Sequence, residues 1–206
     1  MHIEFKNGAR HFGAQTVFQN LNLSLKPGER YAVLGGNGSG KSTLLKSIYG
    51  ALSLSEGSIS WQVNNKELSP FEAAQQMSFA GPYFELIEEL TALDFLNYYG
   101  RFRKYLPNCN PQTILEKAWL ANAADKEIRN FSSGMKQRLK LALALLSANE
   151  VVLLDEPTSN LDPKGMNWFQ QLLKDNLGGR SLFVGSNFSE VETFLCEEKL
   201  ELKEYQ

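Results

Sequence analysis

A glycine-rich segment holds the first residues that could do chemistry. It runs from Gly35 to Thr43 and matches the phosphate-binding pattern G-x-x-x-x-G-K-[ST] at every fixed position. Its glycines let successive backbone N–H groups point at an anion, and the following helix adds the positive end of its dipole. Lys41 is placed to reach the outer phosphates, and Ser42 to offer its hydroxyl to Mg²⁺. The predicted nucleotide contacts are Gly35, Asn37, Gly38, Ser39, Gly40, Lys41, Ser42 and Thr43.

Two carboxylates end a second segment. Val151 to Leu154 form an apolar run that predicts a buried strand, and Asp155 and Glu156 follow it directly. Ligands of parallel sheets lie at the carboxyl ends of the strands. Asp155 is therefore placed to hold Mg²⁺, directly or through water, and Glu156 to orient or deprotonate an attacking water. The alternative is a pair of ordinary surface acids, and the glycine-rich segment upstream favours the chemical interpretation.

Two further candidate binding sites each allow two interpretations. Ser132 and Gly134 precede a long apolar-periodic helix, where they could form a second anion site or a simple helix cap. Phe12 precedes the glycine-rich segment and could stack on an adenine ring or pack within a strand.

The surrounding elements must position these side chains. Tyr31–Leu34 and Ser42–Tyr49 predict a buried strand and a helix on either side of the glycines. The first thirty residues and Ser58–Val63 alternate as antiparallel strands. A buried strand at Ser181–Gly185 is tipped by Ser186 and Asn187, and a closing edge strand is expected at 200–202.

The middle of the chain reads as helical. Helices are expected at Phe95–Tyr105 and Gln112–Ala121, with Thr91 as a cap, and again after Arg138. Residues from about 85 to 148 therefore predict a helical insert in an α/β chain. The basic and aromatic run at 101–105 is typical of a solvated helix face, so no nucleic acid is expected there.

Length, charge balance and cysteine content exclude several other classes of function. The 206 residues suit one compact domain, and 21 basic against 23 acidic residues create no field for nucleic acid or an anionic membrane. Two cysteines are too few for a disulfide framework, which favours a reducing compartment. Neither an export signal nor an apolar stretch of about 20 residues is visible, so we expect another chain to hold this one at any membrane.

Taken in series, the motifs GGNGSGKST, FSSGMKQR and LLDEPTSNLD and the tip at Asn187 resemble those of the ATP-binding cassette (ABC) ATPases. The resemblance covers essentially the whole chain. It implies an α/β fold over residues 1–206, with a phosphate-loop NTPase core, an antiparallel β subdomain and an inserted α-helical subdomain.

The resemblance also implies ATP and Mg²⁺ as cofactors and a head-to-tail dimer. Ser132 and Gly134 would contact the γ-phosphate bound by the other chain, and Asp162 would link the two sites. Phe12 matches the adenine-stacking aromatic, and Glu156 the catalytic carboxylate. Ser42 and Asp155 match the metal ligands.

Three departures from the family pattern bear on activity. A glutamine is missing at Ala80–Pro82, and its role is lost or has moved, for instance to Glu85. Ser133 and Met135 replace a glycine and a glutamine of the signature. Asn187 replaces a histidine, and a neutral donor on the γ-phosphate costs about 1–2 kcal/mol, which predicts slow hydrolysis.

The resulting functional hypothesis is a cytoplasmic ATPase subunit of an ABC transporter. It would work as a homodimer or heterodimer on a separate membrane permease, peripheral to the membrane. The glutamates at 85, 88 and 89 would either contact that permease or be solvated. The alternatives are a regulatory or silent ATP-binding cassette and a soluble ABC ATPase outside transport.

Overall fold

The computed structural model describes residues 1–205, and these form two compact units. The first unit comprises Met1–Phe79, Asn149–Glu156 and the chain from Gly179 onward. The second comprises Ala80–Ala148 and Pro157–Gly178. The helical insert predicted at about 85–148 thus lies in the second unit, which also takes in a later segment of the chain.

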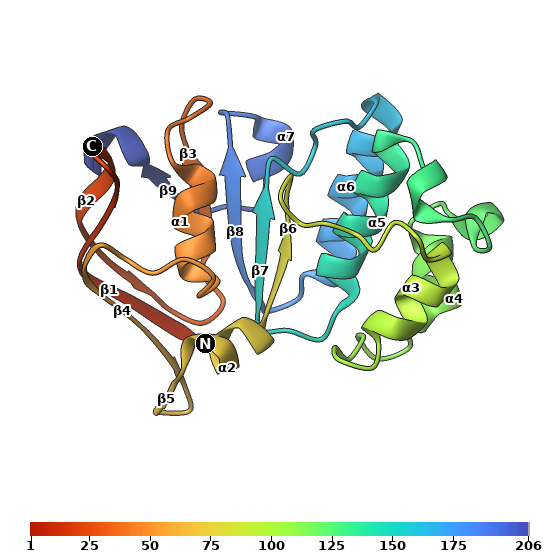
Figure 1. Ribbon diagram of the computed structural model, residues 1–206, viewed down its shortest axis with the longest axis horizontal. Helices are drawn as coiled ribbons and strands as arrows, with labels where there is room; N and C mark the ends of the chain where they lie inside the picture. The colour runs from red at the N-terminus through yellow and green to blue at the C-terminus, as the bar shows by residue number, and fades with distance from the viewer. Residues whose placement is uncertain (206) are drawn as a thin grey trace. The chain divides into compact units, whose positions relative to one another are not determined.

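A five-stranded sheet forms the centre of the first unit (Figure 1). Its order is β6 (Met77–Ala80), β7 (Val151–Asp155), β8 (Ser181–Ser186), β3 (Arg30–Leu34) and β9 (Glu198–Glu201). The β3 strand pairs in parallel with β8 and β9, and β7 pairs in parallel with β8. Every residue of β7 and β8 is buried, which explains their continuous apolar runs. The predicted parallel sheet and the edge strand near the end of the chain are confirmed.

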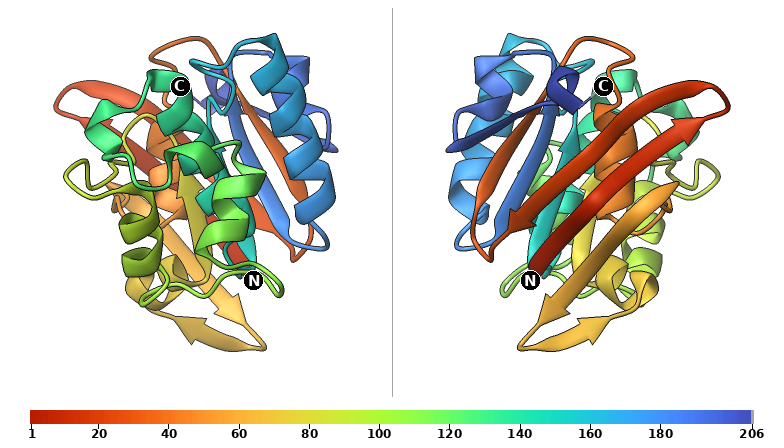
Figure 2. Two further views of the ribbon diagram at one scale, coloured as in Figure 1. Left: turned by 90° about the vertical axis from the view of Figure 1, so that its right-hand side faces the viewer. Right: turned by 90° about the vertical axis from the view of Figure 1, so that its left-hand side faces the viewer.

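The second sheet of this unit has four antiparallel strands (Figure 2, right). Its order is β2 (Gln15–Leu25), β1 (His2–Phe12), β4 (Glu56–Val63) and β5 (Lys66–Leu68). The sequence analysis did not predict β5, because three residues that include two charges show no strand pattern. The strand forms because Asn64 and Asn65 adopt positive φ angles of 51° and 63°, which suits a two-residue hairpin.

One helix connects the two sheets through the core. Leu44, Leu45 and Ile48 of α1 (Lys41–Ile48) are fully buried. They share an apolar cluster with Phe5 of the antiparallel sheet and Phe183 of the parallel sheet. Since apolar side chains on both sides hold α1, its amino-terminal end and the glycine loop before it have a fixed place. The unit is completed by α2 (Pro70–Gln75), α7 (Glu190–Thr193) and a 3-10 turn at Leu202–Tyr205.

The second unit is helical (Figure 2, left). It contains α3 (Ala92–Tyr99), α4 (Pro111–Lys117), α5 (Ser133–Leu146) and α6 (Pro163–Asn176), with 3-10 turns at Ala121–Ala123 and Ile128–Asn130. Thr91 caps α3 by accepting from the backbone N–H of Asp94, as predicted.

Two predicted helix ends were wrong. The expected helix at Phe95–Tyr105 starts at Ala92 and stops at Tyr99, because Gly100 follows it and the next residues form turns. Tyr105 donates its hydroxyl to Leu96 O at 2.6 Å, which folds this segment back on the helix. The helix expected at Gln112–Ala121 ends at Lys117, since Trp119 has a φ of 58° that an α-helix cannot continue.

No helix within residues 1–205 combines the length and the apolar character that crossing a bilayer requires.

Candidate functional site

The glycine loop between β3 and α1 has glycines where side chains find no space. At Gly35 an added Cβ would lie 2.2 Å from Ser39 Oγ, and at Gly40 it would lie 2.3 Å from Val17 Cγ1. Gly40 also has a φ of 98°, which disfavours other residues. Asn37 and Gly38 are exposed, and an added Cβ at Gly38 would meet nothing within 4 Å. The two tightly packed glycines are therefore the two that the phosphate-binding pattern fixes.

Lys41 is the charged centre of this loop. Its side chain is only 4% exposed, and its Nζ donates to Gly35 O at 2.9 Å and to Gly36 O at 3.0 Å. The same Nζ lies 3.4 Å from Glu156 Oε1. A buried lysine needs such compensation, because an unpaired buried charge is costly. The ammonium group is thus held against the inner side of the loop, facing carbonyl oxygens and one carboxylate.

Ser42 and Asp155 form the predicted metal pair. The Ser42 hydroxyl donates to Asp155 Oδ2 at 2.5 Å. Asp155 is 1% exposed, and its Oδ1 has no hydrogen-bond partner among the described residues. A Cβ added at Gly185 would lie 2.8 Å from this oxygen, so only glycine leaves it accessible. A carboxylate oxygen beside a hydroxyl is a donor set that Mg²⁺ prefers.

Burial dominates the electrostatics of Asp155. It raises the pKa of the carboxyl, and the hydrogen bond from Ser42 and the charge of Lys41 only partly oppose it. A buried carboxylate with one unpaired oxygen lowers the stability of the fold. Such a group is a common feature of binding sites, where a ligand supplies the missing partner.

At Glu156, directly after Asp155, the backbone leaves the extended conformation of the strand. Its φ of 47° is left-handed, and its N–H donates to Gly185 O at 2.8 Å. Strained conformations of this kind cluster at functional sites. The turn keeps Asp155 in the core while it brings the side chain of Glu156, 34% exposed, next to Lys41.

Asn187 lies just beyond a junction between β8 and the glycine loop. Ser186 O accepts from Gly35 N–H at 3.3 Å. The Ser186 hydroxyl donates to the buried Glu192 Oε2 at 2.5 Å and accepts from Ser189 N–H at 3.1 Å. Asn187 itself is exposed. The sequence analysis missed Glu192, because nothing in the pattern distinguishes it from the exposed Glu190 two residues earlier.

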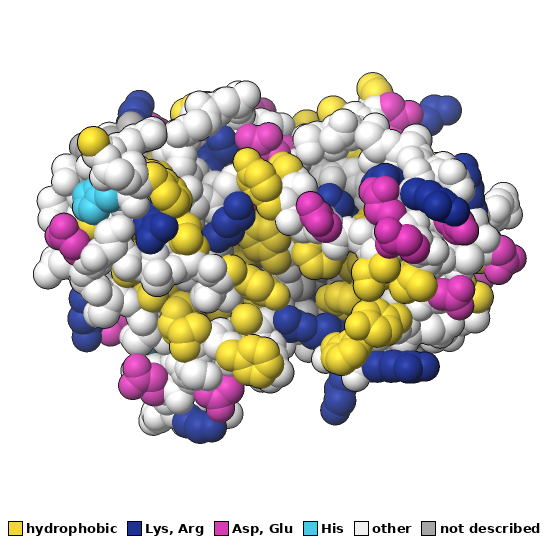
Figure 3. All heavy atoms as spheres, in the orientation of Figure 1, with side chains coloured by type: hydrophobic (Ala, Val, Ile, Leu, Met, Phe, Trp, Pro, Cys, Tyr) yellow, Lys and Arg dark blue, Asp and Glu magenta, His cyan; other side chains and the backbone are white. Residues whose placement is uncertain are grey.

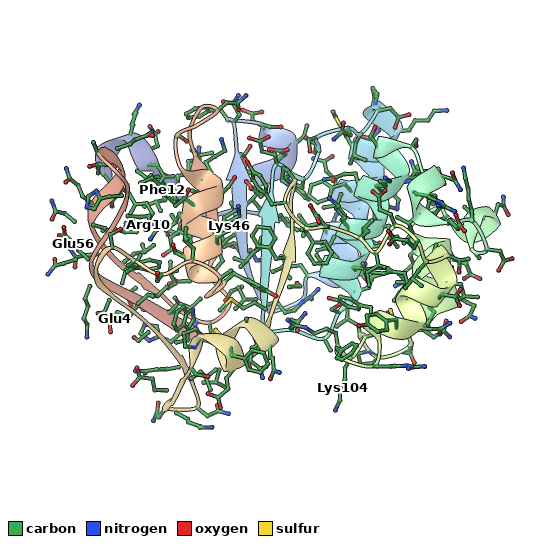
Figure 4. All side chains as sticks on the ribbon, in the orientation of Figure 1. Glu4, Arg10, Phe12, Lys46, Glu56 and Lys104 are labelled. Atoms are coloured by element: carbon green, nitrogen blue, oxygen red, sulfur yellow. The ribbon has the colours of Figure 1, made fainter. Side chains whose placement is uncertain are left out.

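Phe12 ends β1 and is 49% exposed, so it does not belong to the core. The guanidinium carbon of Arg10 lies 4.5 Å from the centre of its ring. Figure 4 labels both side chains beside α1. Arg10 was not among the residues predicted from the sequence, because the β1–β2 register is irregular on both sides of it and the strand period does not reveal the contact.

The signature residues lie in the second unit. Ser132 is exposed and caps α5, its Oγ accepting from Met135 N–H at 3.3 Å. The helix cap considered from the sequence is therefore present, and among the described residues no acceptor takes the Ser132 O–H proton. Gly134 is partly exposed, and an added Cβ would lie 3.1 Å from Asn160 O. Thus the signature presents polar groups at the surface, and the backbone of Asn160 packs closely against Gly134.

Asp162 has a structural role in the same unit. It is exposed and accepts from Gly165 N–H at 2.8 Å, which caps α6. Gln137 of α5 donates to Pro157 O at 2.8 Å. The segment before α6 is therefore attached to the signature helix.

The predicted acidic surface at 85–89 is partly neutralised. Glu88 Oε1 lies 2.5 Å from Lys136 Nζ, and Lys140 Nζ donates to Gly81 O at 3.4 Å. Burial and the nearby Lys136 lower the pKa of Lys140. A pocket of about 380 Å³ is lined by Pro82, Glu85, Leu86, Glu88, Lys136 and Lys140. Glu85 thus faces basic side chains of its own unit.

Comparison with known proteins decides the family. The family model described as "ABC transporter" matches residues 18–159. The chain belongs to the ABC transporter family. The matched range takes in the glycine loop, the signature and the two carboxylates of this ABC cassette, while Phe12 and Asn187 lie outside it. The resemblance predicted from the motifs is confirmed.

Curated relatives of the cassette carry transporter names. It is 32% identical over 199 residues to the Nod factor export ATP-binding protein I of Burkholderia lata, covering 95% of the cassette and 66% of that relative. The cassette therefore spans slightly less than two thirds of that relative. It is 31% identical to the lantibiotic transport ATP-binding protein SrtF of Streptococcus pyogenes, covering 98% of the cassette and 91% of the relative.

Solved structures confirm the predicted fold class. A dimeric ATP-binding cassette in a post-hydrolysis state bound to ADP and Pi superposes with a TM-score of 0.80 at 27% identity, over 97% of this cassette and 93% of that chain. A putative ABC transporter ATP-binding protein from Pyrococcus furiosus gives a TM-score of 0.80 at 20% identity over the full length of both chains, and so supports the fold alone.

Proposed function

We propose that this cassette binds ATP with Mg²⁺ and hydrolyses it as the nucleotide-binding subunit of a transporter. The observation that carries the proposal is the meeting of Lys41, Ser42, Asp155 and Glu156 at one place in the first unit. A phosphate loop, a metal pair and a candidate base lie there within hydrogen-bonding or ion-pairing distance of one another. The family assignment supports ATP as the nucleotide.

Each of these residues has a defined part in the reaction. The loop N–H groups receive the phosphates, and Lys41 moves from the carbonyls of Gly35 and Gly36 to the outer phosphate oxygens. Ser42 and Asp155 would hold Mg²⁺, and the ion would supply positive charge against the phosphate oxygens.

Glu156 accepts a proton from water as the water oxygen bonds to the γ-phosphorus. The bond to the ADP oxygen then breaks. With its side chain 34% exposed, Glu156 is accessible to that water.

The signature supports a second copy of the cassette as the partner. Ser132 and Gly134 lie at the surface of the second unit and point to a ligand that another molecule brings. The solved relative in a dimeric state with ADP and Pi supports this arrangement. In our proposal the Ser132 hydroxyl donates to the γ-phosphate held by the partner's loop.

A separate membrane permease would complete the transporter, with the cassette on the cytoplasmic side of the membrane. The names of the relatives, which include Nod factor export and lantibiotic transport, support export as the direction. Purification of the cassette from detergent extracts of its native membranes would identify the permease that accompanies it.

Phosphate release by Glu156→Gln tests the proposed chemistry. We expect the variant to keep ATP affinity and to lose about a hundredfold or more of its turnover, since general-base catalysis contributes about that factor. Glu190→Gln, an exposed acid of the same unit, is the matched control and should behave as the wild type. Equal rates for Glu156→Gln and the wild type would contradict the proposal.

One observation favours a silent cassette as the second candidate. Asn187 provides no charge at the position where the family pattern has a histidine. ATP binding by the wild type without any phosphate release would support that candidate.

A further inference from the structure

Arg10 and Phe12 make an unusual pair at the end of β1. They are two residues apart in the strand, and the β1–β2 register shifts between Arg10 and His11, so it is the observed contact and not the strand period that places the two side chains together. The Arg10 guanidinium carbon lies 4.5 Å from the Phe12 ring centre, within cation–π distance. One face of the aromatic ring is therefore covered by a positive charge.

Arg10 is held in this position from two sides. Its Nη1 donates to Ser53 O at 3.0 Å, in the loop that follows α1. That loop is anchored to β1, because Ser55 N–H donates to Ala9 O at 2.8 Å and His11 N–H donates to Ser55 Oγ at 3.1 Å. The Arg10 Nε is buried and has no hydrogen-bond partner among the described residues. The guanidinium group thus combines this unpaired nitrogen with its contact to the Phe12 ring.

The rest of the Phe12 ring is open. With Arg10 over one face, Phe12 still exposes 49% of its surface. In the space-filling view apolar and basic side chains lie next to one another on the part of the surface that β1 and α1 form (Figure 3). An aromatic ring with one covered and one open face is suited to receive a flat ligand.

The pair also lies near the phosphate loop. Val17 of β2 packs against Gly40, since a Cβ added there would lie 2.3 Å from Val17 Cγ1. Val17 falls between Thr16 and Phe18, which pair across the hairpin with His11 and Arg10. The end of the β1–β2 hairpin is thus in contact with the amino-terminal end of α1, where the triphosphate would bind.

We propose that Arg10 is a positioning residue for the adenine base: its guanidinium backs one face of the Phe12 ring while adenine stacks on the other. This inference rests on the proposed binding of ATP. The charge draws π-electron density towards Arg10, so the outer face repels an electron-rich purine less. The contact also fixes the ring before the nucleotide arrives, which lowers the entropic cost of binding.

The same geometry has two competing interpretations with different consequences. If Arg10 occupied the face that adenine needs, its removal would strengthen ATP binding. If Arg10 only attracted the negative triphosphate, its removal would weaken binding of every polyphosphate equally.

Titration calorimetry with two ligands separates these cases. We would measure the Kd of Mg·ATP and of inorganic triphosphate with Mg²⁺ for the wild type, Arg10→Ala, Arg10→Lys, Phe12→Ala and the double variant Arg10→Ala/Phe12→Ala. Lys6→Ala is the matched control, because it removes an exposed cation from the same strand.

We expect Arg10→Ala to weaken Mg·ATP about threefold, because the Phe12 ring is then no longer fixed before binding and must be ordered by the nucleotide. Its Kd for triphosphate should stay unchanged. Arg10→Lys keeps the charge without the planar group, so its loss should be intermediate. In the Phe12→Ala background the Arg10 change should have no further effect, since the two residues act together.

The inference would be overturned by tighter ATP binding of Arg10→Ala, by equal losses for ATP and triphosphate, or by a full loss that persists without Phe12. If Arg10→Ala and Arg10→Lys both bind ATP with the Kd of the wild type, the inference is wrong and the proposed function still stands. A wild type that binds neither ligand would overturn the proposed function, and this inference with it. Melting temperatures of the unliganded variants identify any that fail to fold.

Discussion

The phosphate loop and the signature segment differ in how much of their binding geometry the chain itself supplies. At the loop, Lys41 has three oxygen partners and Ser42 is bonded to Asp155, from elements far apart in sequence. At the signature, Ser132 has one local bond to Met135 N–H and is otherwise exposed. One region is an assembled half-site, and the other is a helix start with polar groups at the surface.

This difference indicates which step each region controls. Substitutions at the loop should change nucleotide binding by a single chain, because its geometry needs no other molecule. Substitutions at the signature should leave that binding intact and change only the steps that two chains perform together. Four substitutions test this division.

Lys41→Ala should have the largest effect. It removes the charge that faces the phosphates and leaves Glu156 without its partner, so we expect ATP affinity to fall about a hundredfold or more. Equilibrium binding of a fluorescent ATP analogue measures this, with the exposed Lys199→Ala as control. A Kd within a factor of two of the wild type would refute the role of Lys41.

Ser132→Asp should separate turnover from binding. Aspartate keeps the cap of α5, but its charge repels a phosphate brought by another chain. We expect the Kd for ATP at low protein concentration to stay the same and phosphate release to fall about tenfold to a hundredfold. Asn110→Asp makes the same kind of change at the cap of α4 and should leave both quantities unaltered. Weaker binding by Ser132→Asp alone would contradict the division of roles.

Asp155→Asn should weaken metal binding and make the unliganded protein more stable. In the folded chain burial raises the pKa of Asp155, so between the unfolded and folded pKa values the folded state holds more protons. Stability of the unliganded wild type therefore falls as pH rises through this window. The neutral variant does not lose stability in this way. We expect its free energy of unfolding to exceed that of the wild type by about 1 kcal/mol at pH 7 and by less at pH 4.

Urea unfolding at the two pH values measures this difference, and the stabilisation of each protein by Mg·ATP shows the lost metal site. If Asp155→Asn is less stable than the wild type at pH 7, the buried Asp155 carboxylate does not destabilise the folded protein and this prediction is wrong.

Asn187→His should have the smallest effect. A histidine that carries charge strengthens the contact to the γ-phosphate, so turnover should rise by up to about tenfold while ATP affinity stays similar. Steady-state phosphate release at pH 6 and pH 8 measures it, since the gain should be larger where the imidazole is protonated. An unchanged or lower turnover would show that asparagine suits this site.

The sequence predicted the phosphate loop, the two carboxylates and the parallel sheet, because each depends on local patterns. A glycine pattern between a strand and a helix, and an apolar run that ends in two acids, need no distant information. The short β5 strand and the end of α3 at Tyr99 escaped prediction because a hairpin turn and the Tyr105 hydroxyl determine them.

Features of the site that depend on tertiary contacts could not be read from the sequence. The unpaired oxygen of Asp155 exists because Gly185, thirty positions later, leaves space beside it. Glu192 belongs to the site only because Ser186 turns its hydroxyl towards it. Arg10 required knowledge of which residues cover the two faces of Phe12.

Complementation of two impaired variants tests the central claim most directly. Lys41→Ala lacks a working loop but keeps its signature, and Ser132→Asp has the reverse defect. If ATP is hydrolysed between the loop of one copy and the signature of another, each variant alone is strongly impaired, while a mixture regains activity through the heterodimer that carries one intact pair. Phosphate release measured across mixing ratios should therefore peak near equal amounts. A mixture that never exceeds the sum of its two components, with both variants folded, would contradict the account.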